Sequence, residues 1–147
     1  MERLTGLAWE AGLTAEPGLA ARVGAGLWAL LAELATDPSL AELVFIEGRR
    51  LDSPRYIPYR HMLDAFSGLL EVAVKAQPLE SQPPEITARA VVSGAVALIS
   101  REVEAGRGGE LLRLQPELLY LTLVPYLGVD LAEEEMRKAR AKLGPDG

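Results

Sequence analysis

The chain has 147 residues and no cysteine, with a formal net charge of −6, 49% hydrophobic residues and only 5% aromatic residues. Without cysteine it has neither a disulfide framework nor thiolate chemistry, and its acidic balance disfavours direct contact with phosphate backbones. A core built mainly from Leu, Val and Ala favours packed helices, because Leu and Ala are strong helix formers. We therefore predict a single all-α helical-bundle domain of about six helices, covering residues 1–147.

The N-terminal region is expected to form two helices. A short one covers residues 1–12, and after the turn at Pro17 a second one continues to about Thr36. Apolar side chains recur in the second helix every three or four residues and form one buried stripe. The members of this stripe are Val23, Leu27, Leu30 or Leu31, and Leu34.

A new helix is expected to begin at Asp37-Pro38. The aspartate side chain caps free backbone amides, and proline suits the first helical position. This short helix is expected to end before Gly48. Prolines then interrupt any regular structure, so a loop is predicted over residues 49–58.

Two long helices are expected in the middle of the chain, over about residues 58–76 and 85–105. One face of the second helix carries only small side chains. This face includes Gly94, and glycine costs roughly 0.8–1 kcal/mol in a helix interior. Another helix is therefore expected to press closely there, either from within the chain or, as we favour, from a second subunit.

The C-terminal part predicts two further helices. The first begins near Pro116, continues towards Gly128, and is apolar on nearly all sides, so it needs cover from two directions. We expect a partner chain to provide the second cover. The last helix is expected to begin at Asp130 as cap, with Glu133 completing a capping box, and to stop at Gly144.

The residues carry no enzyme signature. The single histidine, His61, has no second histidine or cysteine with which to build a metal site or a nucleophile–base pair. It is interpreted as a helix-surface or pocket-edge residue, with a polar ligand contact as the alternative. The acidic run 133–135 is explained by capping and surface pairing, and Gly24-Ala25-Gly26 lacks the third glycine of a dinucleotide loop. We therefore predict no catalysis, metal or cofactor.

Bulky side chains are concentrated on three successive segments of a chain that is otherwise poor in aromatic residues. They either fill the core between these helices or line a mostly apolar pocket, with tyrosine hydroxyls, a tryptophan N–H or His61 as polar groups. The residues concerned are Trp28, Phe45, Tyr56, Tyr59, Met62 and Phe66.

The order of these segments resembles the C-terminal ligand-binding and dimerising domain of TetR-type transcriptional regulators. The resemblance rests on LWALLAELATDPSLAELVFIEG (27–48), on the long helix ending at Ala76, and on PPEITARAVVSGAVALISREVEAGRGGELLRLQPELLYLTLVPYLG (83–128). The succession of a helix, a glycine turn, a Leu-rich bend, Pro-Glu-Leu and Pro-Tyr-Leu-Gly looks like the family's dimerising helix pair.

The resemblance implies an effector-sensing domain that forms a homodimer through a four-helix bundle of residues 85–105 and 116–127 and their two-fold mates. It also implies a pocket for a small hydrophobic effector. The implied ligand-binding residues are Trp28, Phe45, Tyr56, Tyr59, His61, Met62, Phe66, Val92 and Val96. The implied interface residues are Ala90, Ser93, Gly94, Ala97, Arg101, Leu118, Leu121, Thr122, Pro125 and Tyr126.

Such regulators begin with a DNA-binding helix-turn-helix head, which has no counterpart in this sequence. Residues 1–12 are expected to be the remnant of the helix that joins head to body, so operator DNA is a partner only through a missing head. The alternative is a headless interaction module that forms heterodimers with intact regulators. Neither a signal peptide nor a membrane-spanning run is expected, which predicts a soluble, cytoplasmic protein.

Overall fold

All of the regular secondary structure in the described part of the chain is helical, which confirms the predicted all-α class. The computed structural model describes residues 2–15, 17–47, 57–78 and 82–144. Its helices are α1 (Glu2–Thr14), α2 (Leu19–Thr36), α3 (Pro38–Glu42), α5 (Ile57–Lys75), α6 (Ile86–Glu104), α7 (Gln115–Leu127) and α8 (Val129–Leu143). Two short segments of other helical types complete them, the π-helical η1 (Leu43–Glu47) and the 3₁₀-helical η2 (Gly108–Leu114).

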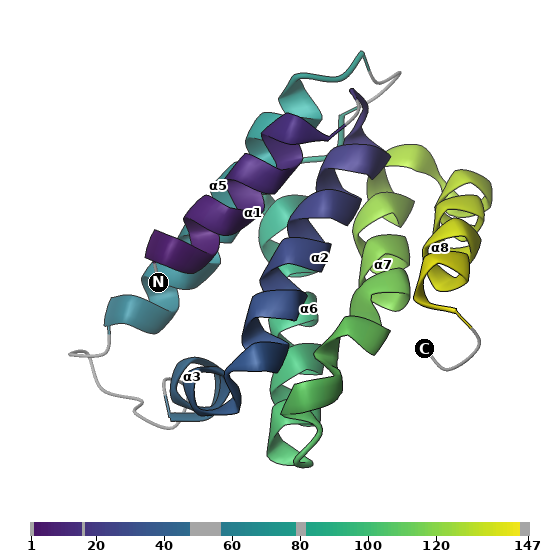
Figure 1. The fold of residues 1–147 in the computed structure, drawn as a ribbon. Helices are drawn as coiled ribbons and strands as arrows, with labels where there is room; N and C mark the ends of the chain where they lie inside the picture. The colour runs from purple at the N-terminus through teal and green to yellow at the C-terminus, as the bar shows by residue number, and fades with distance from the viewer. Residues whose placement is uncertain (1, 16, 48–56, 79–81, 145–147) are drawn as a thin grey trace.

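Helix α2 lies in the middle of the bundle, with α1 on one side of it, α7 on the other and α6 behind (Figure 1). Two glycines on opposite faces of α2 permit close approach by its neighbours. A Cβ atom at Gly26 would lie 3.2 Å from the backbone oxygen of Ala8 in α1. On the other face, the Gln115 side-chain amide of α7 donates a 3.2 Å hydrogen bond to the carbonyl of Gly24.

Of the described helices, α2 is the one that is long and apolar enough to cross a bilayer, judged by length and composition alone. Its 18 residues include only two charged side chains, Arg22 and Glu33. No membrane-spanning run was expected from the sequence. Four residues of α2 are buried, and most of the others are partly buried beside neighbouring helices; the four are Leu19, Leu30, Leu31 and Leu34.

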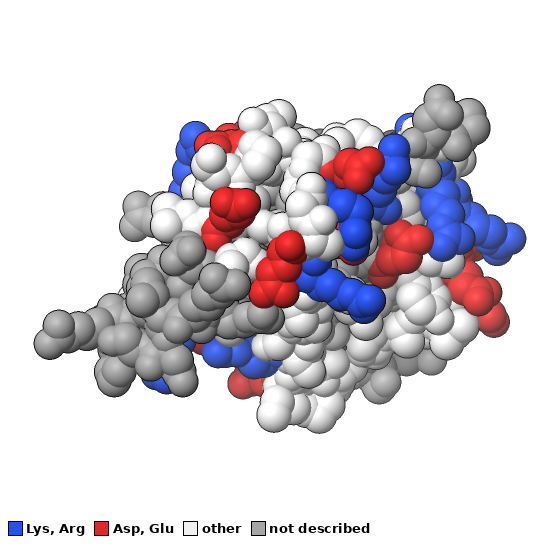
Figure 2. Space-filling model, turned by 90° about the horizontal axis from the view of Figure 1, so that it is seen from below, with Lys and Arg blue, Asp and Glu red and all other residues white. Residues whose placement is uncertain are grey.

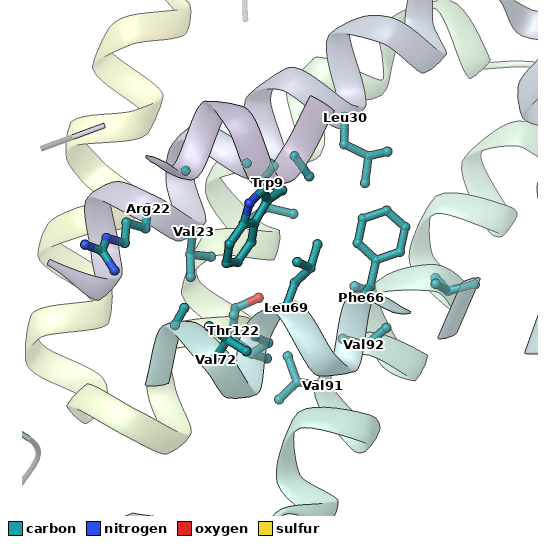
Figure 3. Close-up of a pocket in the computed structure, with 18 of the residues that line it drawn as sticks. Trp9, Arg22, Val23, Leu30, Phe66, Leu69, Val72, Val91, Val92 and Thr122 are labelled. Atoms are coloured by element: carbon teal, nitrogen blue, oxygen red, sulfur yellow. The ribbon is translucent and has the colours of Figure 1, made fainter. Parts of the chain in front are cut away.

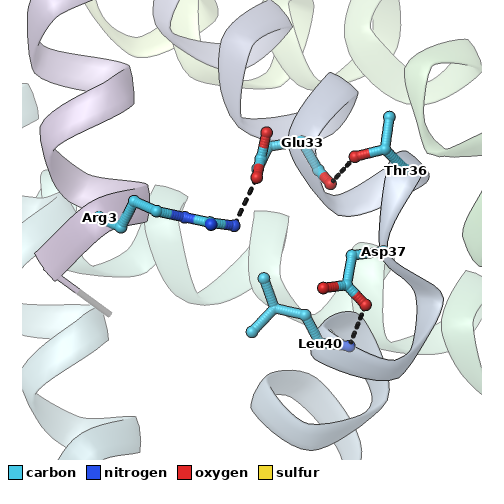
Figure 4. Close-up of polar contacts among 5 residues, drawn as sticks. All are labelled: Arg3, Glu33, Thr36, Asp37 and Leu40. Carbon is cyan, nitrogen blue, oxygen red and sulfur yellow. Dashed lines mark hydrogen bonds and ion pairs between the residues drawn. The ribbon is translucent and has the colours of Figure 1, made fainter.

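The chain turns from α2 into α3 as the sequence predicts. A side-chain oxygen of Asp37 accepts a 3.1 Å hydrogen bond from the backbone amide of Leu40 (Figure 4). At the end of α2, the Thr36 hydroxyl donates a 2.8 Å hydrogen bond to the carbonyl of Glu33. The Glu33 carboxylate also pairs with Arg3 of α1. The same corner therefore holds the start of α3 and one end of α1.

Two clusters of buried hydrophobic side chains form the core. The larger one includes Leu31, Leu34 and Phe45, and the smaller one includes Leu123 and Ala132. Further side chains pack against both clusters, namely Leu27 of α2 and Val92 of α6. The junction between the two clusters therefore lies between α2 and α6.

Helix α7 receives cover from a second direction within its own chain, which the sequence analysis had expected from a partner chain. Helix α8 packs along α7 (Figure 1), and Ala132 and Ala139 of α8 are buried in the smaller core cluster. The Arg140 guanidinium donates a 2.8 Å hydrogen bond to the Glu117 carboxylate of α7. The pattern of apolar residues on α7 did not indicate which element covers each face.

The predicted start of the last helix is also corrected. Helix α8 begins at Val129, and its N-cap residue is Gly128, which has a φ of 86°. Asp130 therefore lies inside the first turn and does not cap the helix. Its carboxylate still faces the positive end of the helix dipole, which explains why an acidic residue suits this position.

The close contact of α1 with α2 predicts a penalty for any side chain at Gly26. We expect Gly26→Leu to lower the free energy of unfolding by about 1–3 kcal/mol, because the Ala8 carbonyl belongs to a rigid helix backbone that must move away. Chemical denaturation followed by circular dichroism measures the change.

The matched control is Gly68→Ala in α5, where an added Cβ meets no atom within 4 Å. Alanine is the better helix former, so this variant is expected to gain about 0.5–1 kcal/mol. A Gly26→Leu protein as stable as the parent would contradict the observed packing of α1.

Candidate functional site

A cavity of about 170 Å³ lies among α1, α2, α5 and α6, where the two core clusters meet (Figure 3). Its walls are almost entirely apolar. Among the described residues of the lining, Trp9, Arg22 and Thr122 are the ones whose side chains contain nitrogen or oxygen. The chemistry that such a cavity supports is the binding of an apolar body with few polar contacts.

Helix α1 forms one wall and the rim of the cavity. Its contribution consists of Ala8, Trp9, Gly12 and Leu13, which lie on one side of the helix. Trp9 is 39% exposed and Leu13 is 60% exposed, so both stand where the cavity meets solvent. This wall was not predicted from the sequence, because residues 1–12 were interpreted only as a connecting helix.

The inner end of the cavity is formed by side chains of the larger core cluster. Phe45 and Met62 are nearly fully buried there, together with Val96 and Ile99 of α6. Phe45 belongs to the π-helical η1, and its carbonyl accepts a 3.3 Å hydrogen bond from the buried Ser100 hydroxyl of α6. Short π-helical segments occur frequently at functional sites, and this one brings the Phe45 ring to the lining.

Helices α5 and α6 form the wall that faces α1 and α2. Phe66, Leu69 and Val72 come from α5, while Val91 and Val92 come from α6 (Figure 3). Ion pairs on the outside join these two helices, Arg89 with Asp64 and Lys75 with Glu85. The four charged side chains are well exposed, so these pairs add little to the stability of the wall.

The polar groups of the lining differ in their availability. The Thr122 hydroxyl already donates a 2.7 Å hydrogen bond to the Leu118 carbonyl within α7. Arg22 is the only charged residue that lines the cavity, and no ion pair within the described ranges includes it. It lies beside Val23 at one end of the lining (Figure 3). Arg22 therefore retains its donors for an outside partner.

The resolved pKa shifts fall on residues outside the cavity lining. Burial raises the pKa of the Tyr126 hydroxyl, and the nearby Glu71 carboxylate adds to this effect. Hydrogen bonds from Arg107 lower the pKa of Glu102 at the exposed end of α6. Among the described residues, no group of three or more acidic, histidine or cysteine side chains is placed to hold a metal ion.

Of the nine predicted ligand-binding residues, five line the cavity, two lie away from it, and two are outside the described residues. Those that line it are Phe45, Met62, Phe66, Val92 and Val96. Trp28 is 38% exposed on α2 and His61 is exposed on α5, both away from the lining. Tyr56 and the side chain of Tyr59 lie outside the described residues.

The predicted interface residues are divided between the surface and the interior. The exposed ones are Ala90, Ser93, Ala97, Arg101 and Pro125, and the partly buried ones are Gly94, Leu121 and Tyr126. The remaining two point inward: Leu118 is 0% exposed in the larger core cluster, and Thr122 lines the cavity. These two are therefore unavailable to a partner, because α7 presents them to its own bundle.

The close approach predicted at Gly94 occurs within the chain. A Cβ atom at this position would lie 3.7 Å from the Leu121 side chain of α7. Its neighbours Ala90, Ser93 and Ala97 instead form an exposed strip on the outer side of α6. The small-residue face is therefore shared between an internal contact and open surface.

Figure 2 shows acidic and basic side chains intermingled on the face that it presents. On α8, Lys138 lies 3.5 Å from Glu134 and 3.4 Å from Glu135.

Comparisons with known proteins found no match for this chain, neither among family models, nor among curated proteins, nor among solved structures. Its function is therefore argued from the cavity and the surface alone.

The cavity predicts opposite effects for the enlargement of two alanines, the partly buried Ala95 and the buried Ala132. Ala95→Leu in α6 places a larger side chain into empty space and is expected to raise the free energy of unfolding by about 0.5–2 kcal/mol. Urea denaturation of the purified variants measures the change.

Ala132→Leu provides the comparison, because Ala132 is fully buried where α8 packs and lies outside the cavity lining. Overpacking at this position is expected to cost about 1–3 kcal/mol. Equal destabilisation by both substitutions would argue against an open cavity at Ala95.

Proposed function

We propose that this chain is a TetR-like effector-sensing and dimerising domain that binds a small, largely apolar molecule in the cavity among α1, α2, α5 and α6. The observation that carries the proposal is a cavity of about 170 Å³ with apolar walls and a rim open to solvent at Trp9 and Leu13. An engineered apolar cavity of about 150 Å³ in another protein binds benzene, so the size suits a small organic molecule.

Energetics support a binding role over a simple packing defect. Protein interiors are close-packed, so an apolar space of about 170 Å³ that opens to solvent at Trp9 and Leu13 leaves the lining side chains without packing partners. The lining offers almost no polar groups with which to hold water. An apolar ligand that fills the space provides these packing partners and removes the lining from water, and this gain drives its binding.

Ligand binding is expected to act through α1. This helix provides the wall with Ala8 and Trp9 and is anchored to α2 by the close contact at Gly26 and by the Arg3–Glu33 ion pair. A ligand that fits one spacing of α1 and α5 better than another shifts the population towards that spacing. In TetR-type regulators the corresponding helix leads to the DNA-binding head. In this proposal, operator DNA is contacted only through such a head.

The exposed strip of α6 is the dimerisation surface in this proposal. Ala90, Ser93 and Ala97 are small and uncharged, so the helix of a second copy can approach closely. Pro125 is exposed and Leu121 partly buried on the neighbouring α7. The inward-facing Leu118 and Thr122 are not included in this surface.

Ligand binding is tested with Trp28→Phe, which leaves Trp9 as the only tryptophan. We expect 1-octanol to shift the Trp9 emission to shorter wavelengths, because the ligand displaces solvent from the rim. At a free concentration of 100 times Kd, it is expected to raise the free energy of unfolding by about 2.7 kcal/mol.

Adding Ala95→Leu fills part of the cavity and is expected to weaken both effects. Ala141→Leu adds the same side chain on the exposed face of α8 and is expected to change neither. An emission shift that is unaffected by Ala95→Leu would place the alcohol elsewhere.

Dimerisation is tested by multi-angle light scattering across a range of concentrations. The parent chain of 15.8 kDa is expected to elute with twice that mass. Ala97→Glu introduces a charge that would be buried without a partner, so it is expected to give monomers. Ala141→Glu makes the same change on exposed α8 and is expected to leave the dimer intact. A parent that is monomeric at every concentration would refute this surface.

A further inference from the structure

We infer that the effector is an amphipathic monoanion, a carboxylate on a short aliphatic or aryl chain, with its head group on Arg22 and its chain in the cavity. The inference rests on the proposed function, since it names the class of molecule that the same cavity takes. The volume of about 170 Å³ fixes the size of the chain at about six to eight carbon atoms, given that a hole of about 150 Å³ holds benzene.

The first argument is the distribution of charge. Among the described residues, Arg22 is the one charged residue of the lining, and their ion pairs leave it without a carboxylate. A guanidinium group is always charged and binds a carboxylate through two parallel hydrogen bonds. A ligand with a negatively charged head group therefore gains binding free energy at Arg22, and a neutral ligand of the same shape does not.

The second argument is the position of Arg22 in the first turn of α2. This turn contains no acidic residue, and the N-cap residue Gly18 makes no side-chain capping bond. The positive end of the helix dipole is therefore not compensated by a side chain of this turn, and it adds to the charge of Arg22. Both favour an anion just outside this end of the cavity, where the guanidinium group of Arg22 extends away from the other labelled lining residues (Figure 3).

The lining also determines the orientation in which a ligand would bind. The rim consists of exposed apolar side chains, Trp9 and Leu13 of α1 and Val72 of α5. The opposite end is closed by the buried Phe45 and Met62. An alkyl or aryl chain thus enters towards Phe45, while its charged head stays at the partly exposed Arg22 and keeps part of its hydration.

The experiment compares octanoate with 1-octanol, which share an alkyl chain and differ in the charge of the head. Both are titrated by calorimetry into the full chain and into its Arg22→Gln, Arg22→Lys and Arg137→Gln variants. Arg137 is exposed on α8, so Arg137→Gln makes the same change in net charge away from the cavity. The parent chain is expected to bind octanoate about tenfold or more tightly than 1-octanol.

Arg22→Gln is expected to remove this preference by weakening octanoate binding alone, and Arg22→Lys is expected to retain part of it. Arg137→Gln is expected to leave both affinities unchanged. Equal affinities of the parent for the two ligands would overturn the role of Arg22 while leaving the cavity proposal intact. Binding of neither ligand would overturn both proposals. The comparison of octanoate with 1-octanol on the parent chain tests the role of Arg22 even if the Arg22→Gln variant fails to fold.

Discussion

The spacing of the helices around α2 is the constraint on which the rest of this structure depends. Gly26 brings the backbone of α1 into contact with one face of α2, and Gly24 brings α7 against the opposite face. A side chain at Gly26 would hold α1 further away, whereas a Cβ atom at Gly24 would lie 3.7 Å from the Gln115 side chain, in ordinary contact. No comparable approach joins α2 to α5 among the described glycines, and the cavity occupies the space between them. The open volume is thus a consequence of tight packing on the other two sides.

The walls of the cavity are held by different kinds of contact. α1 packs on α2 through the backbone approach at Gly26 and the buried Leu4. α5 is joined to α6 across the outer surface by exposed ion pairs, which contribute little free energy. The packing of α5 comes instead from buried side chains such as Met62, Leu70 and Val74, which belong to the two core clusters.

Local signals predicted much of the fold. The Asp37-Pro38 restart follows from capping chemistry that involves only neighbouring residues, and it is present as predicted. Long apolar repeats similarly predicted α2, α5 and α6 to within a few residues. Asp130 does not have the capping role expected of it, because the N-cap residue is Gly128. Glycine has no polar side chain that would indicate a cap in the sequence.

The candidate site was less predictable, because it depends on which faces meet. Phe45, Met62 and Phe66 were found as bulky residues on successive segments, whereas the wall from Trp9 to Leu13 required knowledge of how α1 packs. An apolar helix such as α7 gives no indication of which neighbour covers each face. Leu118 and Thr122 were consequently assigned to a partner although they face the interior.

The geometry of α6 connects the two parts of the proposed function. Val92 and Val96 line the cavity, while Ser93 and Ala97, each the next residue in the chain, lie on the outer surface. A helix transmits displacement as a rigid body, so a ligand that moves Val92 and Val96 must also move the outer strip. If a second copy packs on that strip, ligand affinity and dimer affinity are linked, and the linkage acts equally in both directions. In the proposed function the effector and the second copy lie on opposite sides of α6, so one helix couples them directly.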